Sequence, residues 1–142
     1  MRIEAYTDGS CSGNPGPGGY AAILTCGKSE RKVYGSIDNT TNNGAELKAV
    51  IAVIDWLNRV QKKPCEVIIH TDSQYICNCS AHKTKKWFTG RKNEELWMEL
   101  IEKGNKGKHH ITFVKVEAHA KNEMNNRVDK MAREECLKAK KG

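Results

Sequence analysis

The sequence predicts an α/β fold, with a mixed sheet covered by helices. Three strand patterns joined by short connections open the chain, at residues 2–7, 20–25 and 31–37, and such a meander pairs antiparallel. An amphipathic helix and a buried strand follow. A strand–helix–strand unit usually returns its second strand parallel to the first through a right-handed crossover. The sheet is therefore expected to contain both antiparallel and parallel pairs.

Length, charge and hydropathy narrow the class of protein. The 142 residues are expected to form a single domain, residues 1–142, with its own core. The mean hydropathy is −0.68, the N-terminus lacks the apolar block of a signal peptide, and no apolar run approaches the ~20 residues that cross a bilayer. We therefore expect a cytoplasmic protein without a membrane partner. The net charge of +7 favours a polyanionic partner, nucleic acid before membrane, over a merely soluble basic protein.

The first strand runs into a turn of unusual composition. Residues 2–7 alternate between two faces, and residues 8–19 hold five of the twelve glycines and two of the three prolines. The strand is therefore expected to end at Asp8. An acid at the end of a strand can take part in ligand chemistry, because open α/β sheets bind ligands there. It can also do no more than close an Asx-turn with the backbone.

Periodicity and turn residues predict the remaining elements. These are helix 45–60, strand 65–71, a short helix from residue 73, helix 93–102, strand 110–116 and helix 125–138. Residues 38–44 and 103–108 are expected to be loops, and residues 138–142 a frayed basic tail.

Two further acids stand in positions that could place them beside Asp8. Asp72 also follows a buried strand, so a parallel crossover would bring it to the same edge of the sheet. Glu46 lies on the side of helix 45–60 that faces the sheet, where an unpaired carboxylate is costly. The alternative for Glu46 is a capping box with Asn43, which would satisfy backbone N–H groups at the start of the helix.

A fourth acid, Asp129, falls at the edge of the inward stripe of the last helix. It could also lie in the first turn of this helix, where an acid suits the helix dipole. Converging carboxylates cannot all stay ionised without cations, and a set of oxygen ligands selects Mg²⁺ or Mn²⁺. Two such ions about 4 Å apart would favour in-line attack at a phosphodiester, one activating water and the other steadying the leaving oxygen.

His119 lies in a polar loop ten residues before Asp129, where it could shuttle protons or be no more than a solvent-exposed side chain. His70, on a buried strand, is expected to be a satisfied core residue. The other histidines, His82, His109 and His110, are expected at the surface.

The six cysteines are scattered and have no zinc-binding spacing, so they are expected to be free thiols. Three of them lie in apolar contexts that indicate packing as small hydrophobic residues: Cys26, Cys65 and Cys136.

Four sequence blocks in order resemble the signatures of type 1 ribonuclease H. They are Thr7-Asp8-Gly9-Ser10 with Gly13 to Gly19, Thr41-Asn42-Asn43 with Glu46-Leu47, Thr71-Asp72-Ser73-Gln74-Tyr75, and His119 with Asn125-x-x-x-Asp129. Together they span about residues 1–135, nearly the whole chain. The resemblance implies a five-stranded mixed sheet of order 3-2-1-4-5, with helices on both faces, and endonucleolytic cleavage of the RNA strand of RNA/DNA hybrids that leaves 5′-phosphate and 3′-hydroxyl ends.

The resemblance also implies roles for single residues. Asp8, Glu46, Asp72 and Asp129 match the family's metal-binding acids, and His119 matches a loop histidine associated with proton transfer or product release. The polar side chains that match contacts to the hybrid are Asn14, Asn43 and Gln74, in the minor groove, and Thr41, near a phosphate of the DNA strand.

The chain departs from the family pattern at two places. Ala118 precedes His119 where glycine is usual, which could change how far that loop swings. Residues 82–92, which we call the basic segment, hold five Lys or Arg and no acid, and replace the longer basic handle of many bacterial members. We expect Lys85 and Lys86, with Trp87 or Phe88, to contact the sugar-phosphate backbone. The alternative is a solvated basic loop over a core-packed Trp87.

These observations leave three functional hypotheses. The first is a monomeric Mg²⁺- or Mn²⁺-dependent ribonuclease that binds two ions and an RNA/DNA hybrid. The second is a non-catalytic nucleic-acid-binding module, which the presence of all four acids disfavours. The third is the ribonuclease domain of a reverse transcriptase or mobile element, which the natural Met1 and compact ending disfavour.

Overall fold

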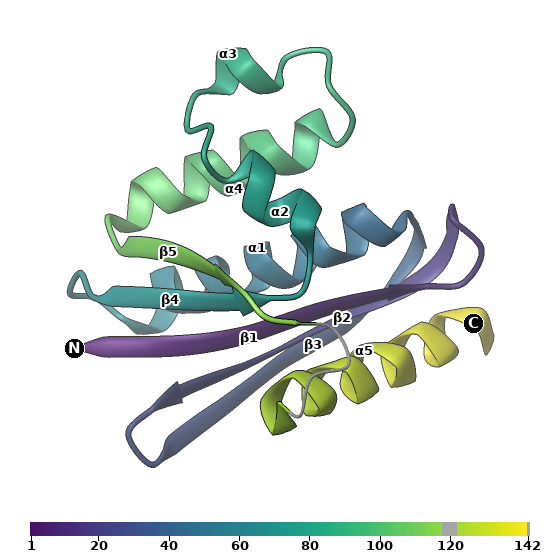
Figure 1. Cartoon of the computed structure of the whole chain (residues 1–142), viewed down its shortest axis with the longest axis horizontal. Coiled ribbons are helices and arrows are strands. Elements are labelled where there is room, and N and C mark those ends of the chain that lie inside the picture. The colour runs from purple at the N-terminus through teal and green to yellow at the C-terminus, as the bar shows by residue number, and fades with distance from the viewer. Residues whose placement is uncertain (118–121, 142) are drawn as a thin grey trace.

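The computed structural model describes residues 1–117 and 122–141, and contains five strands and five helices in those residues (Figure 1). In chain order they are β1 (Arg2–Cys11), β2 (Gly16–Cys26), β3 (Ser29–Thr40), α1 (Asn42–Val60), β4 (Glu66–Thr71), α2 (Gln74–Cys79), α3 (Lys85–Phe88), α4 (Glu94–Gly107), β5 (His110–Lys115) and α5 (Glu123–Lys141).

The five strands form one mixed sheet of order β3-β2-β1-β4-β5. The pairs β1–β2 and β2–β3 are antiparallel, and the pairs β1–β4 and β4–β5 are parallel. Both the meander and the crossover predicted from the sequence are therefore confirmed, as is the strand order that the family resemblance implied.

Helices α1 and α5 cover opposite faces of this sheet. A side chain on Gly9 would overlap the backbone of α1 at Ala45, whereas one on Gly19 would overlap the backbone of α5 at Cys136. Gly19 pairs with Ser10, the neighbour of Gly9, so the two glycines point to opposite faces. Figure 1 shows α4 stacked beyond α1 and α5 alone across the sheet. The main apolar core lies between the sheet, α1 and α4, where Trp97 is 2% exposed and Phe88 is 1% exposed.

Strand β1 does not end at Asp8, as the turn composition led us to expect. It continues to Cys11 because β2 pairs with it along this stretch, with Asp8 opposite Ala21. The parallel pairing with β4 ends earlier, at Tyr6 opposite His70. Asp8 therefore lies just past the last β1–β4 pair, so it follows the end of this parallel pairing and not the end of the strand.

Three helices, α1, α4 and α5, also differ from the prediction at their ends. Helix α1 begins at Asn42, since the hydroxyl of Thr41 accepts a hydrogen bond from the Gly44 N–H at 3.0 Å and caps the helix. Helix α4 continues to Gly107, through the expected loop 103–108, where Lys103 lies 2.9 Å from the Asp55 carboxylate of α1. Tertiary contact with α1 thus outweighs the low helix propensity of the glycines.

Helix α5 begins two residues earlier than expected and continues to Lys141, so residues 138–141 are helical and not the frayed tail that we expected. The Lys138 ammonium lies 2.7 Å from the Glu135 carboxylate, and lysines suit the negative end of a helix dipole. None of the helices in residues 1–117 and 122–141 is long and apolar enough to cross a membrane.

The isolated cysteines and histidines are placed largely as predicted. All six cysteines are free thiols, with Cys65 and Cys136 buried. His70 stacks on Tyr6 and lies 3.0 Å from the Glu4 carboxylate, so it is a satisfied residue. His109 is not a surface group, because its Nδ1 accepts a hydrogen bond from the Cys65 N–H and its Nε2 is buried.

Candidate active site

Three of the predicted acids meet where β1, β4 and α1 approach one another. Asp8 on β1, Glu46 on α1 and Asp72 directly after β4 each offer a carboxylate oxygen within 4.8 Å of the others. Asp8 is buried, at 4% exposure, whereas Glu46 and Asp72 are partly accessible. The cluster therefore has a buried floor and an open side.

Gly9 lets α1 come close enough to build this cluster. A Cβ at Gly9 would lie against the backbone carbon of Ala45 and the backbone nitrogen of Glu46. Any side chain there would push the start of α1 away from β1, and Glu46 with it. The Gly9 N–H donates a hydrogen bond to the Asp8 carboxylate at 2.9 Å, and its closeness to Glu46 also lowers the pKa of that carboxyl, against the effect of burial.

Glu46 is not a capping residue. Because Thr41 is the N-cap, Gly44 occupies the third helical position and Glu46 the fifth, beyond the reach of a capping box. Its Oε2 atom is buried and has no hydrogen-bond partner among the described residues. The structure therefore removes the capping explanation and leaves a buried oxygen without a partner inside the acidic cluster.

Burial and mutual repulsion perturb the two innermost acids. Burial raises the pKa of Asp8 to about 7, the charge of Asp72 adds to the effect, and a hydrogen bond with Glu46 opposes it. Burial, followed by the charge of Asp8, raises the pKa of Glu46 well above its ordinary value. The cluster thus holds protons near neutral pH unless cations compensate its charge.

Asp129 approaches the cluster from the opposite face of the sheet. It lies in the second turn of α5, one turn later than expected, and raises the pKa of Asp8 through a hydrogen bond and through its charge. Its side chain is 40% exposed, and its Oδ2 lies 3.0 Å from the Arg133 guanidinium. Arg133 was not among the residues predicted for the site, although its spacing of four residues from Asp129 on a helix is a signal for such a pair.

The cluster suits a hard divalent cation. All donors are carboxylate oxygens, which Mg²⁺ and Mn²⁺ prefer, and the buried Glu46 Oε2 has an unused lone pair. Compensation by a cation would also remove the repulsion that raises the two pKa values. His119, the fifth predicted catalytic residue, lies outside the described residues.

A hydrogen bond joins the predicted substrate-binding residues of the turn and of α1. The side-chain oxygen Oδ1 of Asn14 accepts it from the Asn42 N–H at 2.8 Å, which ties the glycine-rich turn to the start of α1. Asn43 is exposed in the first turn of α1. Thr41 uses one lone pair of its hydroxyl as the cap acceptor, so its hydroxyl proton and its second lone pair remain for a ligand. Exposed Gln74 starts α2 and donates to Asn78 at 2.7 Å.

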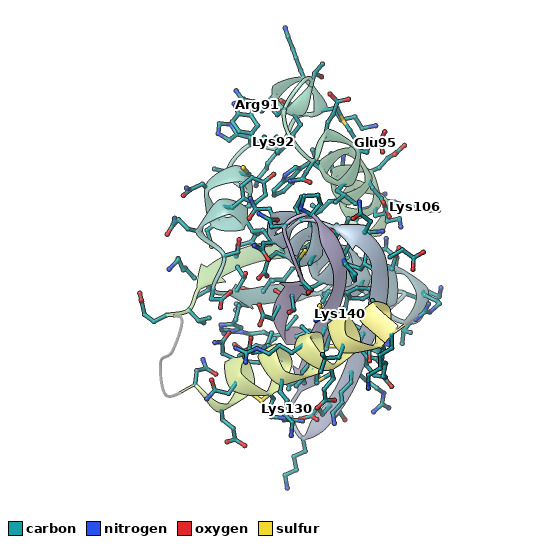
Figure 2. All side chains as sticks on the ribbon, turned by 90° about the vertical axis from the view of Figure 1, so that its right-hand side faces the viewer. Arg91, Lys92, Glu95, Lys106, Lys130 and Lys140 are labelled. Carbon is teal, nitrogen blue, oxygen red and sulfur yellow. The ribbon has the colours of Figure 1, made fainter. Side chains whose placement is uncertain are left out.

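The basic segment lies apart from the acids, around α3 and before α4. Figure 2 shows Arg91 and Lys92 at the end of the molecule farthest from α5, which carries Lys130 and Lys140. Lys85 and Lys86 occupy the first two positions of α3 and are exposed. Lys85 lies 3.8 Å from the Glu102 carboxylate of α4.

The two aromatic residues of this segment have different environments. Phe88 is 1% exposed and stacks on Trp97, so the expectation that it could contact a substrate is wrong. Trp87 is only partly buried. His82 stacks on its ring with a centroid distance of 3.6 Å, and the Arg91 guanidinium carbon lies 3.8 Å from the ring centroid. Two groups at such distances occupy opposite faces of the ring, and Phe88 packs nearly perpendicular to it with a centroid distance of 4.9 Å. Only part of the ring edge therefore remains for contact, as the alternative of a core-packed Trp87 also implied.

Comparison with known proteins agrees with this fold. The family model for RNase H matches residues 1–137. A ribonuclease H from Acetivibrio thermocellus is 43% identical over 150 residues, covering 99% of this chain and 98% of the relative. One from Thermoanaerobacter sp. strain X514 is 41% identical, covering 94% of this chain and 88% of the relative.

Solved structures give the same result. LC11-RNase H1 in complex with an RNA/DNA hybrid superimposes with a TM-score of 0.81 at 26% identity, over 96% of this chain and 98% of that one. LC9-RNase H1, a type 1 RNase H with the type 2 active-site motif, gives a TM-score of 0.83 at 25% identity, over 97% of this chain and 73% of that one. With a family match over nearly all of its length and relatives above 40% identity, this chain belongs to the RNase H family, among the type 1 enzymes.

Proposed function

We propose that this ribonuclease H hydrolyses the RNA strand of RNA/DNA hybrids by a two-metal-ion mechanism, leaving 5′-phosphate and 3′-hydroxyl ends. The observation that carries the proposal is the cluster of Asp8, Glu46 and Asp72, within 4.8 Å of one another, with a buried Glu46 oxygen that has no described partner. The structural likeness to LC11-RNase H1, solved with an RNA/DNA hybrid, supports the same substrate here.

In this proposal four acids hold the ions. They would be Asp8, Glu46, Asp72 and Asp129, with Asp8 at the centre, because it is buried and interacts with each of the other three. Two Mg²⁺ or Mn²⁺ ions would supply an activated water and stabilisation of the leaving oxygen. The carboxylates orient the reacting phosphate in line and stay ionised once cations offset their mutual repulsion.

The remaining residues bind the hybrid or move protons. The amide groups of Asn14, Asn43 and Gln74 hydrogen-bond 2′-hydroxyls, which DNA lacks, and the exposure of Asn43 and Gln74 supports this role. Thr41 donates its hydroxyl proton to a phosphate of the DNA strand. His119 transfers a proton near the leaving oxygen or assists release of the product.

We also propose that Lys85 and Lys86 contact backbone phosphates, with the edge of Trp87 beside them. The chain acts as a monomer, since one copy supplies all four acids.

A cleavage assay tests the proposal. End-labelled RNA/DNA hybrid, duplex RNA and duplex DNA are incubated with Mg²⁺, with Mn²⁺ and with EDTA. We expect cleavage of the RNA strand of the hybrid only, in either metal and never in EDTA, with ends that a 5′-phosphate-dependent exonuclease accepts. Asp72→Asn should abolish turnover while hybrid binding persists.

Equal cleavage of all three duplexes, or cleavage in EDTA, would contradict the proposal. Salt-dependent hybrid binding without cleavage in either metal would instead identify a non-catalytic binding module.

A further inference from the structure

The hydroxyl of Tyr75 lies at the centre of a hydrogen-bond network that the reaction itself does not require. It accepts a hydrogen bond from the Trp97 indole N–H at 2.8 Å and one from the Asn93 side-chain amide at 3.2 Å. It donates to the Lys92 carbonyl at 3.4 Å. Its lone pairs and its proton are therefore all used within the protein.

This network joins two parts of the molecule that face the nucleic acid in the proposed function. Tyr75 is the second residue of α2 and lies three residues after Asp72 of the acidic cluster. Lys92 closes the basic segment, and Asn93 follows it directly. In Figure 1, α3 lies beyond α4 and away from the sheet. The hydrogen bonds of Tyr75 therefore connect the end of the basic segment to α2 and α4.

The backbone at the junction needs such support. Asn93 has a φ of 63°, in the left-handed region, where asparagine is tolerated at some cost. The Asn93 side chain does not cap α4, but reaches Tyr75. The Tyr75 contact thus fixes the direction in which the chain leaves the basic segment.

Apolar packing supports α3 from the other side. Phe88 stacks on Trp97 with a centroid distance of 4.7 Å, and Trp97 packs edge-on against Tyr75 at 6.0 Å. Trp97 therefore contacts both α3, through its ring face, and Tyr75, through its N–H. Phe88, Trp97 and Tyr75 form a continuous path from the basic segment to the helix that follows Asp72.

We propose that Tyr75 is a positioning residue, whose hydroxyl holds the basic segment in a fixed orientation relative to the carboxylate site. The proposal rests on the proposed function, because the lysines of the segment contact the hybrid in it. A segment held in place loses less conformational entropy on binding, so the hydroxyl should improve hybrid affinity and leave the chemical step unchanged.

The test is Tyr75→Phe, which removes only the hydroxyl. We expect KM for a long hybrid to rise about threefold to tenfold, as for the loss of one or two hydrogen bonds, with kcat unchanged. The slope of log Kd against log salt should fall by about one for each phosphate contact that is lost. A hybrid too short to reach the basic segment should show no difference between variant and wild type.

Hydrogen exchange gives a readout that needs no substrate. In Tyr75→Phe, amides of residues 82–92 should exchange faster, while those of α1 keep their wild-type rates. Asn93→Gly accepts the same backbone conformation and removes only one of the three hydrogen bonds, so it should reproduce the effects in weaker form and serves if Tyr75→Phe does not fold. Tyr34→Phe, on exposed β3, is the matched control and should behave as wild type.

The outcomes separate the two proposals. An unchanged KM, salt slope and exchange rate in a folded Tyr75→Phe protein would overturn the positioning role, as would a lower kcat alone. Failure of the wild-type protein to bind or cut hybrid would instead overturn the proposed function, and with it the role of Tyr75 in affinity.

Discussion

The guanidinium of Arg133 lies 3.0 Å from the Asp129 carboxylate, one helical turn further along α5. Asp129 therefore has a cation on one side and the acidic cluster on the other, where it raises the pKa of Asp8. In the proposed function, a divalent ion and Arg133 would compete for the same carboxylate.

This competition predicts the effect of Arg133→Gln. We expect the variant to reach half-maximal activity at a metal concentration about twofold to threefold lower than wild type, because a nearby positive charge is removed. Stability should change little, since the pair is largely exposed. Metal titrations of activity provide the measurement, with Arg127→Gln as the control, since Arg127 pairs with Glu30 on β3. A higher metal requirement would show that Arg133 orients Asp129.

Gly9 provides a second prediction, because it sets the distance between β1 and α1. In Gly9→Ala the new methyl group would overlap the backbone of Ala45 and Glu46, so α1 must shift. We expect a loss of about 1–3 kcal/mol in the free energy of unfolding, and a larger relative loss of kcat because Glu46 moves. Urea unfolding and cleavage kinetics measure the two effects.

Gly104→Ala is the matched control for this substitution. Gly104 lies inside α4, and a Cβ there has nothing within 4 Å among the described residues. We expect it to stabilise the protein by about 0.5–1 kcal/mol, the usual gain from alanine in a helix interior, without an effect on activity. A Gly9→Ala variant as active as Gly104→Ala would refute the role of the close approach.

His119→Ala should slow cleavage and leave residual activity. A group that assists proton transfer typically contributes about 10²- to 10⁴-fold, and water can replace it in part. His110→Ala replaces an exposed histidine on β5 and serves as the control. The pH dependence of kcat should lose one titration in His119→Ala only. A His119→Ala variant with wild-type kinetics would restore the interpretation of a solvent-exposed loop residue.

The sequence was sufficient for the meander, the parallel crossover and the meeting of Asp8, Glu46 and Asp72, because strand alternation, helix periodicity and the return of a crossover strand follow local or general rules. The full strand order came from the resemblance to ribonuclease H. The sequence was insufficient where contacts between distant parts of the chain determine where a strand or helix ends. Strand β1 passes Asp8 because β2 pairs with it, and α4 passes Lys103 because α1 supports it.

The sequence also could not show which of the two adjacent aromatic residues, Trp87 or Phe88, is buried in the core. Adjacent aromatic residues in a basic run carry no local signal for which one faces the core. Here Trp97 provides the stacking surface that buries Phe88, and Trp97 is nine residues further along the chain on α4. Likewise, only the position of the Thr41 cap removed the capping-box interpretation of Glu46.

The acidic cluster makes stability depend on pH in the absence of metal. The pKa of Asp8 is raised to about 7 in the folded protein, mainly by burial, so the native state binds a proton that the unfolded state has released above about pH 4. Stability from this group is complete below pH 4 and is lost as the pH rises towards 7. The raised pKa of Glu46 acts in the same direction.

We therefore expect the free energy of unfolding in EDTA to fall by about 2–4 kcal/mol between pH 5 and pH 8, at about 1.4 kcal/mol for each unit of pKa difference. Asp8→Asn should abolish the part of this fall that comes from Asp8 and be more stable than wild type at pH 8, because a neutral amide carries no charge into the buried site, while burial of Glu46 keeps the remainder. Asp38→Asn, on β3, should keep the wild-type profile. Chemical unfolding at several pH values measures the effect.

Saturating Mg²⁺ should recover stability at pH 8 in wild type but much less in Asp8→Asn, because the ion stabilises the native state through the carboxylate that this variant lacks. Stability that rises from pH 5 to pH 8 in EDTA would show that the cluster is not protonated in the folded protein.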